Sequence, residues 1–370
     1  YGGTNIDYAY SIQQTSDGYI VAGHTASFGA GSYDFLVIKL AIEGSISWAN
    51  TYGDTGGDWA YSIQETTDGY IVAGYTNSFS VNSSDFLVIK LGLDGAVTWA
   101  KTYGGSSSDW AYSIQKTSDG GYIVTGSTTS FGTGGDSLVI KLDSGGTVSW
   151  AKTYGDTGGD LAYSIRETSG GGYIIAGYTT SFGAGSYDFL LIKINSLGTV
   201  SWAKTYGGNG SDHARSIKQT SDGGYIVAGY TYSFGAESKE DSPNVGQIAS
   251  FGTTSINNSL NGVAYLNFLV IKLDSSGDIG GSCDYLQDCE PTVGSPEITG
   301  VERTTIVATL IEEGFSETPA DVDIDDPDIQ SNTICGGTEE EEEEEPVTPI
   351  PIPTFVVEAS VSVYGGYATV

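Results

Sequence analysis

The chain repeats one pattern of hydrophobic and polar positions with a period of about 51 residues. In the clearest copy, 103–153, apolar and small or polar side chains alternate along WAYSIQK, which is the period-two pattern of a pleated strand. The turn Asp119-Gly120-Gly121 follows, and its glycines can take the positive φ angles of a tight hairpin. No helical period interrupts the copy, so each repeat predicts four short strands. The expected strands of this copy are residues 110–116, 122–125, 137–142 and 147–153.

Five such copies predict the architecture of most of the chain. They begin at Tyr1, Tyr52, Tyr103, Tyr154 and Tyr206, and four of them close on the marker SWAKTYGG or a variant of it. A fixed period of this length indicates a stacked or radial array, and four strands per period are typical of a propeller blade. We therefore expect an all-β, five-bladed β-propeller of four-stranded repeats. A parallel β-solenoid is the competing array, although its turns are usually shorter. The markers contain Trp48, Trp99, Trp150 and Trp202.

The third strand of each copy is almost entirely apolar, as in FLVIKL, which suits a strand buried between neighbouring sheets. One lysine interrupts each run, and in four copies an aspartate stands five residues before it. Because the lysine recurs in all five copies, we interpret it as one half of a structural ion pair with a carboxylate rather than as a catalytic group. The lysines are Lys39, Lys90, Lys141, Lys193 and Lys272, and the aspartates are Asp34, Asp85, Asp136 and Asp188.

The pattern divides the chain into four parts. Residues 1–290 form the propeller, with an insertion at about 237–265 in the fifth copy. That copy also lacks its fourth strand, because DIGGSCDYLQDCEP stands where SWAKTYGG is expected. Residues 291–338 predict a small β extension, and 339–354 an acidic and proline-rich linker that begins with seven glutamates.

Residues 355–370 predict one last strand, whose alternating side chains echo the missing element. The strand could close its own blade or be added to a neighbouring subunit, and we favour the second alternative. The residues of its apolar face are Phe355, Val357, Ala359, Val361 and Val363.

The recurring units SDGGYIVAGYT and SFGAGSYDFLVIKL, followed by SWAKTYGG, resemble β-propeller-type repeats of secreted and cell-surface proteins of bacteria and archaea. The resemblance covers about residues 1–275 and concerns the type of repeat rather than an activity. It implies an exported protein whose propeller serves as a scaffold or a binding module.

Charge narrows the range of partners. The formal net charge is −32, and residues 290–370 alone hold 19 acidic residues and one arginine. Nucleic acids and anionic membranes need clustered Lys and Arg, so we expect neither as a partner. No apolar run reaches the length of a membrane span. Since Tyr1 opens within the pattern, we expect a mature exported chain, located outside the cell or on its surface.

Three cysteines lie outside the regular repeats, without the spacing of a metal site, so a disulfide is the favoured interpretation. Cys283 and Cys289 are close enough in sequence to pair, and Cys335 is the alternative partner. Three glycosylation sequons begin at Asn82, Asn209 and Asn257, all in predicted loops.

Motifs for enzyme chemistry are absent from the sequence. The only two histidines, His24 and His213, stand at different positions of the repeat, and no G-x-S-x-G or phosphate-loop pattern occurs. We therefore expect no enzyme and no cofactor. Asp321, Asp323 and Asp325 alternate like the start of a calcium loop, but the glycine and glutamate of that motif are missing, which leaves only a looser calcium site as an alternative.

Two functions follow as expectations. The first is a structural subunit of an extracellular filament or surface assembly that polymerises with itself through the C-terminal strand. The alternative is a secreted carbohydrate-binding propeller, in which aromatic side chains near the first strands stack on glycans. The aromatic residues concerned are Tyr8, Trp59 and Trp110, with Leu161 and His213 at the equivalent positions of the other copies.

Overall fold

The computed structural model describes residues 1–80, 83–233 and 267–279, together with the backbone of four short strands between 286 and 310. No helix occurs among these residues, and the expectation of an all-β chain made of repeated four-stranded antiparallel sheets is confirmed. Within each sheet the strands of the repeat form a meander, in which each strand pairs with the next one in sequence.

The strand boundaries follow the repeat. Sheet 1 contains β1 (Asp7–Thr15), β2 (Gly18–Thr25), β3 (Asp34–Ala41) and β4 (Ile46–Gly53). Sheet 2 contains β5 (Asp58–Thr66), β6 (Gly69–Thr76), β7 (Asp85–Leu91) and β8 (Val97–Tyr103). Sheet 3 contains β9 (Asp109–Lys116), β10 (Tyr122–Thr128), β11 (Asp136–Leu142) and β12 (Val148–Gly155). Sheet 4 contains β13 (Asp160–Glu167), β14 (Tyr173–Thr179), β15 (Asp188–Ile194) and β16 (Val200–Tyr206). Within the described part of the chain, sheet 5 contains β17 (Asp212–Gln219), β18 (Tyr225–Thr231) and β19 (Asn267–Leu273).

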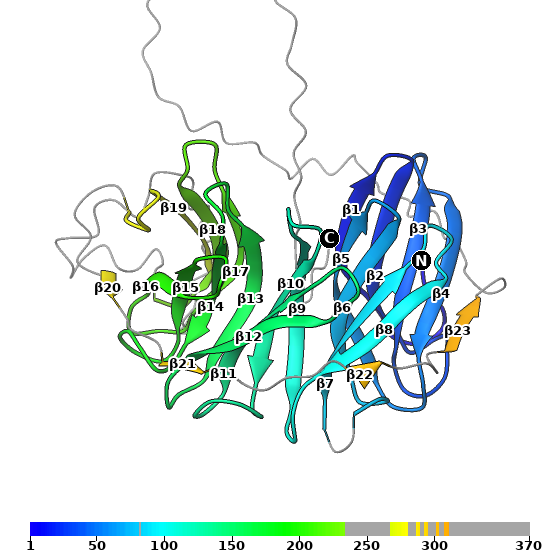
Figure 1. The fold of residues 1–370 in the computed structure, drawn as a ribbon, viewed down its shortest axis with the longest axis horizontal. Coiled ribbons are helices and arrows are strands. Elements are labelled where there is room, and N and C mark those ends of the chain that lie inside the picture. The colour runs from blue at the N-terminus through cyan, green and yellow to red at the C-terminus, as the bar shows by residue number, and fades with distance from the viewer. Residues whose placement is uncertain are drawn as a thin grey trace, which may run out of the picture.

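Four short strands from the region after the repeats extend the other sheets. Each pairs antiparallel with the outermost strand of one sheet, so that sheets 1 to 4 have five strands (Figure 1). Three of these strands come from residues 291–338, the predicted small β extension, and they are the fifth strands of sheets 3, 2 and 1. The added strands are β20 (Leu286–Asp288) on β16, β21 (Thr292–Gly294) on β12, β22 (Val301–Glu302) on β8 and β23 (Val307–Leu310) on β4.

The five sheets follow one another around an open centre, with the first strand of each sheet innermost (Figure 1). The inner strands β1, β5, β9, β13 and β17 contact their neighbours in that order. Within the described residues, no contact of comparable extent joins β17 back to β1, and the sheets form a U-shaped arc. The tryptophans of the four markers occupy equivalent places, each opposite the lysine of its third strand.

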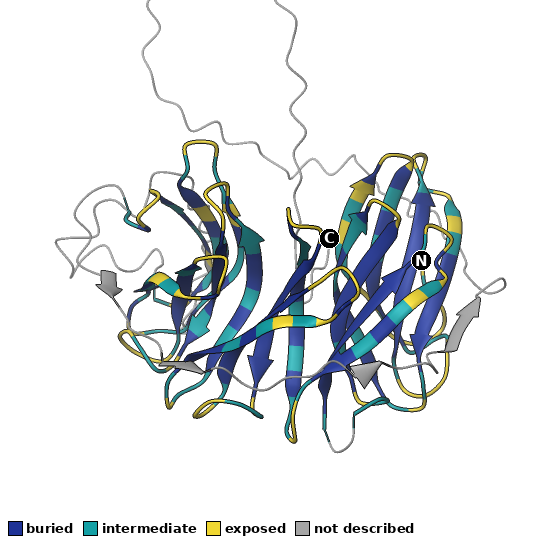
Figure 2. Cartoon of the chain, viewed as in Figure 1, coloured by how far each residue is buried: buried dark blue, intermediate teal, exposed yellow. Residues whose placement is uncertain are grey.

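The core lies in the seams between consecutive sheets (Figure 2). At the first seam, Phe35 and Val37 of β3 pack against Tyr70, Val72 and Leu87 of sheet 2, and all five side chains are almost fully buried. Both faces of each inner sheet are covered, which explains the nearly continuous apolar third strands. Burying one large apolar side chain stabilises a fold by about 1.5–3 kcal/mol, so the seams provide most of the stability.

The marker SWAKTYGG is explained by these seams. The Trp48 ring lies 6.0 Å from the ring of Tyr70 in the next sheet, and its indole N–H donates to the Leu93 carbonyl at 3.1 Å. The Tyr52 hydroxyl is buried and donates to the Gly95 carbonyl at 2.7 Å. Thus the two aromatic residues of the marker hold the last turn of the following sheet. The same tyrosine bond recurs from Tyr103 to Gly146, Tyr154 to Gly198 and Tyr206 to Gly277.

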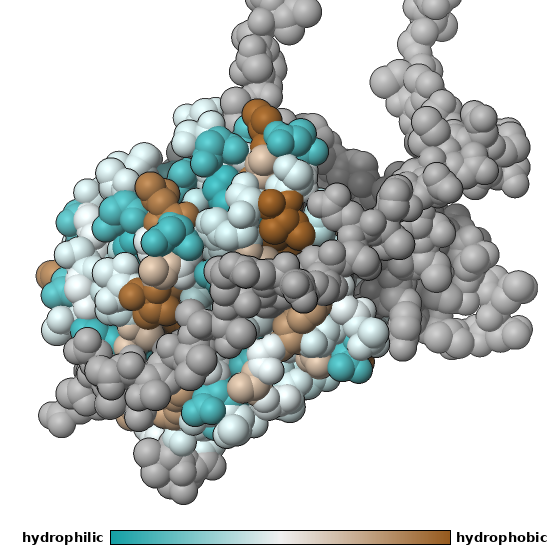
Figure 3. All heavy atoms as spheres, turned by 90° about the vertical axis from the view of Figure 1, so that its right-hand side faces the viewer, coloured by the Kyte–Doolittle hydropathy of each residue, from teal (hydrophilic) through white to brown (hydrophobic). Residues whose placement is uncertain are grey.

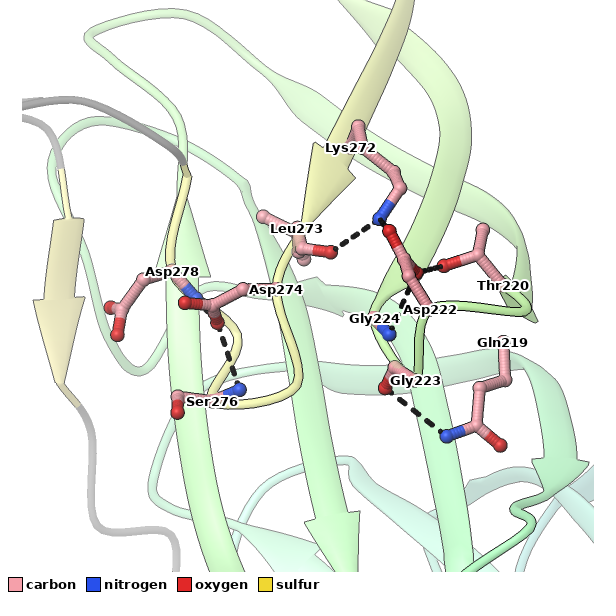
Figure 4. Close-up of polar contacts among 10 residues, drawn as sticks. All are labelled: Gln219, Thr220, Asp222, Gly223, Gly224, Lys272, Leu273, Asp274, Ser276 and Asp278. Carbon is pink, nitrogen blue, oxygen red and sulfur yellow. Dashed lines mark hydrogen bonds and ion pairs between the residues drawn. The ribbon is translucent and has the colours of Figure 1, made fainter.

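In four of the five sheets the repeated lysine is paired with a carboxylate, but not with the aspartate five residues before it. Lys39 is 4% exposed and reaches Asp17, in the turn between the first two strands, at 2.8 Å. In sheet 5, Lys272 binds Asp222 at 2.8 Å and the Leu273 carbonyl at 3.1 Å (Figure 4). Closeness in sequence does not identify the partner, because the turn that contains Asp17 lies nearer to the Lys39 ammonium than Asp34 does on the lysine's own strand.

The two terminal sheets expose apolar side chains that are buried elsewhere in the array. Ile12 in β1 is 48% exposed, whereas the equivalent Ile63 is 2% exposed. Phe268 in β19 is 68% exposed, whereas the equivalent Phe189 is fully buried. Figure 3 shows the side of the molecule that sheet 1 forms, where hydrophobic side chains alternate with polar ones on the visible surface. Each terminal sheet therefore presents a face of the kind that forms a seam inside the array.

Candidate binding site on the inner strands

The inner strands are joined by side chains that bind the backbone of the next strand. Ser62 in β5 accepts a hydrogen bond from the Ile114 N–H at 3.2 Å, and Gln64 accepts one from the Lys116 N–H at 2.8 Å. These N–H groups lie on the edge strand of a sheet, where an unpaired donor would invite association. The serine bond recurs at four seams, from Ser11, Ser62, Ser113 and Ser164, and the glutamine bond at three, from Gln13, Gln64 and Gln115.

A row of tyrosine rings crosses the same strands. Tyr10, Tyr61, Tyr112 and Tyr163 occupy one position of the repeat, and their successive ring centroids lie 4.7, 5.3 and 5.2 Å apart. In sheet 5 the equivalent residue is Arg215. Its guanidinium carbon lies 3.8 Å from the centroid of the Tyr163 ring, within the range of a cation–π contact. The row of tyrosines therefore ends in a positive charge.

A pocket lies where these strands converge. Tyr61, Tyr112, Tyr163, Arg166 and Arg215 line it, and no carboxylate does. The Arg166 guanidinium donates to the Ile165 carbonyl at 2.8 Å, and Arg215 donates to the Tyr230 hydroxyl at 3.2 Å. The remaining lining residues are the serines that share one repeat position, Ser11, Ser62, Ser113, Ser164 and Ser216.

The aromatic positions named from the sequence are not among the residues that line this pocket, and several lie in packed clusters. The Trp59 ring lies 4.7 Å from Tyr75, 5.4 Å from Tyr33 and 6.2 Å from His24. Tyr8 is 51% exposed, at the open end of the array. His213 takes the equivalent place in sheet 5, with its ring centroid 4.6 Å from that of Tyr230. Most of these rings therefore pack against neighbouring rings, and the ring of Tyr8 is exposed at sheet 1.

The two histidines are neutral at physiological pH. Burial lowers the pKa of His24 to about 4, although the charge of Asp7 opposes this. Burial, together with the charge of Arg215, lowers the pKa of His213 to about 4. Their rings therefore act as aromatic packing groups rather than as cations.

Pairs of buried carboxyl groups form a second repeated feature, one at each seam. Asp34 of sheet 1 faces Asp58 of sheet 2, and burial together with the Asp58 charge raises the pKa of Asp34 to about 7. The equivalent pair between sheets 3 and 4 is Asp136 and Asp160. A Cβ on Gly155 would lie 2.5 Å from Asp136 Oδ1 and 2.6 Å from Asp160 Oδ2, so glycine at this position lets the two carboxyl groups approach each other. No group of three or more His, Cys, Asp or Glu that could hold a metal ion occurs among the described residues.

Most of the site residues named from the sequence lie outside the described residues. This applies to the three cysteines, to the calcium candidates Asp321, Asp323 and Asp325, to Asn82 and Asn257, and to the strand 355–370. Asn209 is described, and it lies exposed in a bend, where a glycan could be accommodated.

The two pocket arginines were not identified from the sequence, although a signal was present. They are departures from the repeat, since Arg166 stands where three other copies have glutamine, and Arg215 where four have tyrosine.

No family model matches the sequence, and no curated protein is significantly similar to it. Nowhere in the described part of the chain does a helix occur that could span a bilayer.

Proposed function

We propose that this chain is a structural subunit of an extracellular filament or surface assembly, built on a five-bladed propeller-type array. Subunits would join by addition of the strand 355–370 of one copy to sheet 5 of the next. The observation that carries the proposal is the strand count of sheet 5. Among the described residues it has three strands, whereas each of the other four sheets has a fourth strand and also accepts a fifth from a remote part of the chain.

Exposure of apolar side chains in sheet 5 supports the proposal. Phe268 is 68% exposed and Ile226 is 39% exposed, whereas the equivalent Phe86 and Ile71 are fully buried. An edge strand with unpaired N–H and C=O groups beside an apolar surface is a template for strand addition. Strand addition at outer edges also occurs four times within the chain, at β4, β8, β12 and β16.

The sequence of 355–370 fits such an edge. Val357, Ala359, Val361 and Val363 alternate with polar side chains, so one face would cover an apolar surface and the other would face water. A contact between the C-terminal strand of one copy and the outer edge of another is heterologous. It does not close on itself in a dimer, and it extends into a filament or an open array.

Proline substitution tests the proposal. The variant Val361→Pro with Val363→Pro removes two backbone donors from the strand without changing the repeats. We expect the unmodified protein to elute as large assemblies and to form fibres in negative-stain electron microscopy, and the variant, like a deletion of 355–370, to elute as single subunits. The matched control is Thr348→Pro in the linker, which should assemble normally. Fibres of the double-proline variant, or single subunits of the unmodified protein, would contradict the proposal.

A secreted carbohydrate-binding propeller is the second candidate. The observation in its favour is the tyrosine row and hydroxyl-lined pocket on the inner strands. Aromatic faces and hydroxyl groups together are the surfaces on which sugars bind. Retention of single subunits on a glycan column favours this candidate, whereas fibres without retention favour the first.

A further inference from the structure

The four seams of the array are built from the same two kinds of sheet face. In sheets 2, 3 and 4 one face packs against the preceding sheet and the other face against the following sheet. We call these the N-side face and the C-side face. At the first seam, the C-side face of sheet 1 contributes Ile20 and Phe35, and the N-side face of sheet 2 contributes Ile63 and Val72. A seam therefore always joins a C-side face to an N-side face.

Sheet 1, at one end of the arc, has an N-side face without a neighbouring sheet among the described residues (Figure 1). Ala9 and Ile12 are exposed on this face, whereas the equivalent Ala60 and Ile63 are buried in the first seam. Figure 3 views the molecule from the side of sheet 1, where hydrophobic side chains form part of the visible surface. This face thus has the composition of one half of a seam.

Sheet 5, at the other end of the arc, has an open face of the other kind. Ile226 and Phe268 are exposed on its C-side, while the adjacent Val227 and Leu269 are buried against sheet 4. The side chains of sheet 1 that are equivalent to Ile226 and Phe268 are fully buried against sheet 2. The described array therefore presents one open face of each kind, and the two are the halves of one further seam.

The polar groups of the inner strands fit the same pairing. At each of the four seams a serine accepts a hydrogen bond from an isoleucine N–H of the next inner strand, as Ser11 does from Ile63 at 3.2 Å. Ser216 is the equivalent acceptor in sheet 5, and the Ile12 N–H is the equivalent donor in sheet 1. A seam between these two sheets would repeat the bond.

The aspartate pairs also differ at the open faces. Each internal seam places an aspartate of a third strand beside an aspartate of the next first strand, as with Asp34 and Asp58. In sheet 5 the third strand has Asn267 at this position, and the first strand of sheet 1 has Asp7. A seam between sheets 5 and 1 would thus combine an asparagine with one aspartate, and it would not bury a second carboxyl group.

The two open faces belong together in two different copies rather than in one. No contact comparable to those between neighbouring inner strands joins β17 to β1 within the described residues. Bringing these strands together in one chain would change the packing of four seams, and buried side chains at native density resist such a change. A second copy can meet either open face without it.

We propose that the C-side face of sheet 5 binds the N-side face of sheet 1 of a second copy of this chain. The contact is heterologous and repeats the internal seam. It is weaker than an internal seam, because the described part of sheet 5 lacks the fourth strand that supplies the Trp48 and Tyr52 contacts at the first seam. The inference does not rest on the strand 355–370, which would bind the edge of sheet 5 and not its face.

The test uses the full chain with Val361→Pro and Val363→Pro as the background, so that strand addition does not contribute. Two face variants, Ile12→Lys and Phe268→Lys, each place a charge on one open face, at a side chain that is exposed in the single subunit. Leu93→Lys is the matched control, because Leu93 is also exposed but lies in the turn between β7 and β8. Sedimentation equilibrium measures association, and thermal unfolding verifies that each variant is folded.

We expect the background protein to associate at concentrations above about 0.1 mM, and to elute as single subunits in dilute chromatography. Its mean mass should rise beyond that of a dimer, because each added copy brings a new open face. Ile12→Lys and Phe268→Lys should each weaken association at least about tenfold, since the seam would bury an unpaired charge, and Leu93→Lys less than about twofold.

A mixture of the two face variants gives the sharpest expectation. The Ile12→Lys copy keeps the open face of sheet 5, and the Phe268→Lys copy keeps the open face of sheet 1. An equimolar mixture should therefore form dimers and no larger species, although neither variant associates alone.

Three results would overturn the proposal. They are single subunits of the background protein at about 1 mM, unchanged association of folded Ile12→Lys, and a mixture of the face variants that forms no dimer. If the background protein does not associate and Ile12→Lys lowers its thermal stability, the array closes on itself and a second copy is not the partner. Fibres of the unmodified protein test strand addition separately, so either proposal can fail alone.

Discussion

At the scale of single residues, the buried carboxyl pairs are the unusual feature of this array. Burial and a neighbouring aspartate raise the pKa of Asp34 and of Asp188 to about 7, and that of Asp136 to about 6. Each of these groups is therefore protonated in the folded protein at a pH where it is ionised in the unfolded chain. Such a group contributes stability that is complete below about pH 4 and is lost as the pH rises through the folded pKa.

The first prediction concerns this pH dependence. Asp34→Asn removes one such titration but keeps the shape of the side chain. We expect the free energy of unfolding of the unmodified protein, relative to this variant, to fall as the pH rises from about 4 to 7. Denaturant unfolding at a series of pH values measures the difference.

Asp17 provides a control of opposite sign. Its bond to Lys39 lowers the pKa of Asp17 in the folded protein. Asp17→Asn should therefore lower the free energy of unfolding most at a pH above the unfolded pKa, and progressively less as the pH falls through the folded pKa. A pH-independent difference between the unmodified protein and Asp34→Asn would contradict the assignment of a raised pKa.

At the scale of the element, the lysine–turn pair is repeated with one gap. Four sheets pair the lysine of the third strand with an aspartate of the first turn. In sheet 4, Gly170 stands at that turn position, and Lys193 instead donates to the Thr168 hydroxyl at 2.6 Å. Space is available for the missing carboxylate, because a Cβ on Gly170 would meet no atom within 4 Å.

The second prediction is that Gly170→Asp stabilises sheet 4. It supplies Lys193 with the partner that the other sheets have, and we expect the free energy of unfolding to rise by about 0.5–1 kcal/mol. Thermal or urea unfolding measures the gain. In a Lys193→Met background the gain should disappear. If it persists there, the ion pair is not its cause.

At the scale of the whole molecule, the described residues form an array that is open at both ends. Sheets 2, 3 and 4 each have two covered faces, whereas sheet 1 and sheet 5 each have one neighbouring sheet among the described residues. Stability in a repeat array is approximately the sum of the repeats and of the contacts between neighbours. As far as the structure describes the chain, each terminal sheet therefore lacks one seam, and sheet 5 also has the fewest strands.

The third prediction is a gradient of backbone protection along single, unassembled subunits. In amide hydrogen exchange followed by mass spectrometry, we expect the slowest exchange in β10 and β11 and the fastest, among the strands of the repeats, in β17 to β19. The reason is that local opening is easiest where few buried contacts must break. Equal protection of all five sheets would mean that the array unfolds as one unit and would contradict this expectation.

The repeat by itself was sufficient to predict the strands of the five copies. Alternation along the first strand, Asp-Gly at the turn and the apolar third strand are local signals, and β1 to β19 lie where these signals place them. The third strand could be assigned to a seam because only a doubly buried strand tolerates an unbroken apolar run. The charge of the chain likewise follows from composition alone.

Only the tertiary structure decided which distant groups meet. Lys39 binds Asp17 rather than Asp34 because the neighbouring strand brings the turn to the lysine ammonium. The pairing of β20 to β23 with the outer edges of sheets 4 to 1 could not be predicted, because strands of two to four residues carry no pairing signal in the sequence. Arg166 and Arg215 lie 49 positions apart in the sequence and line one pocket because the repeat places equivalent strands side by side. Sequence periodicity determines the unit, whereas the packing of units determines the sites between them.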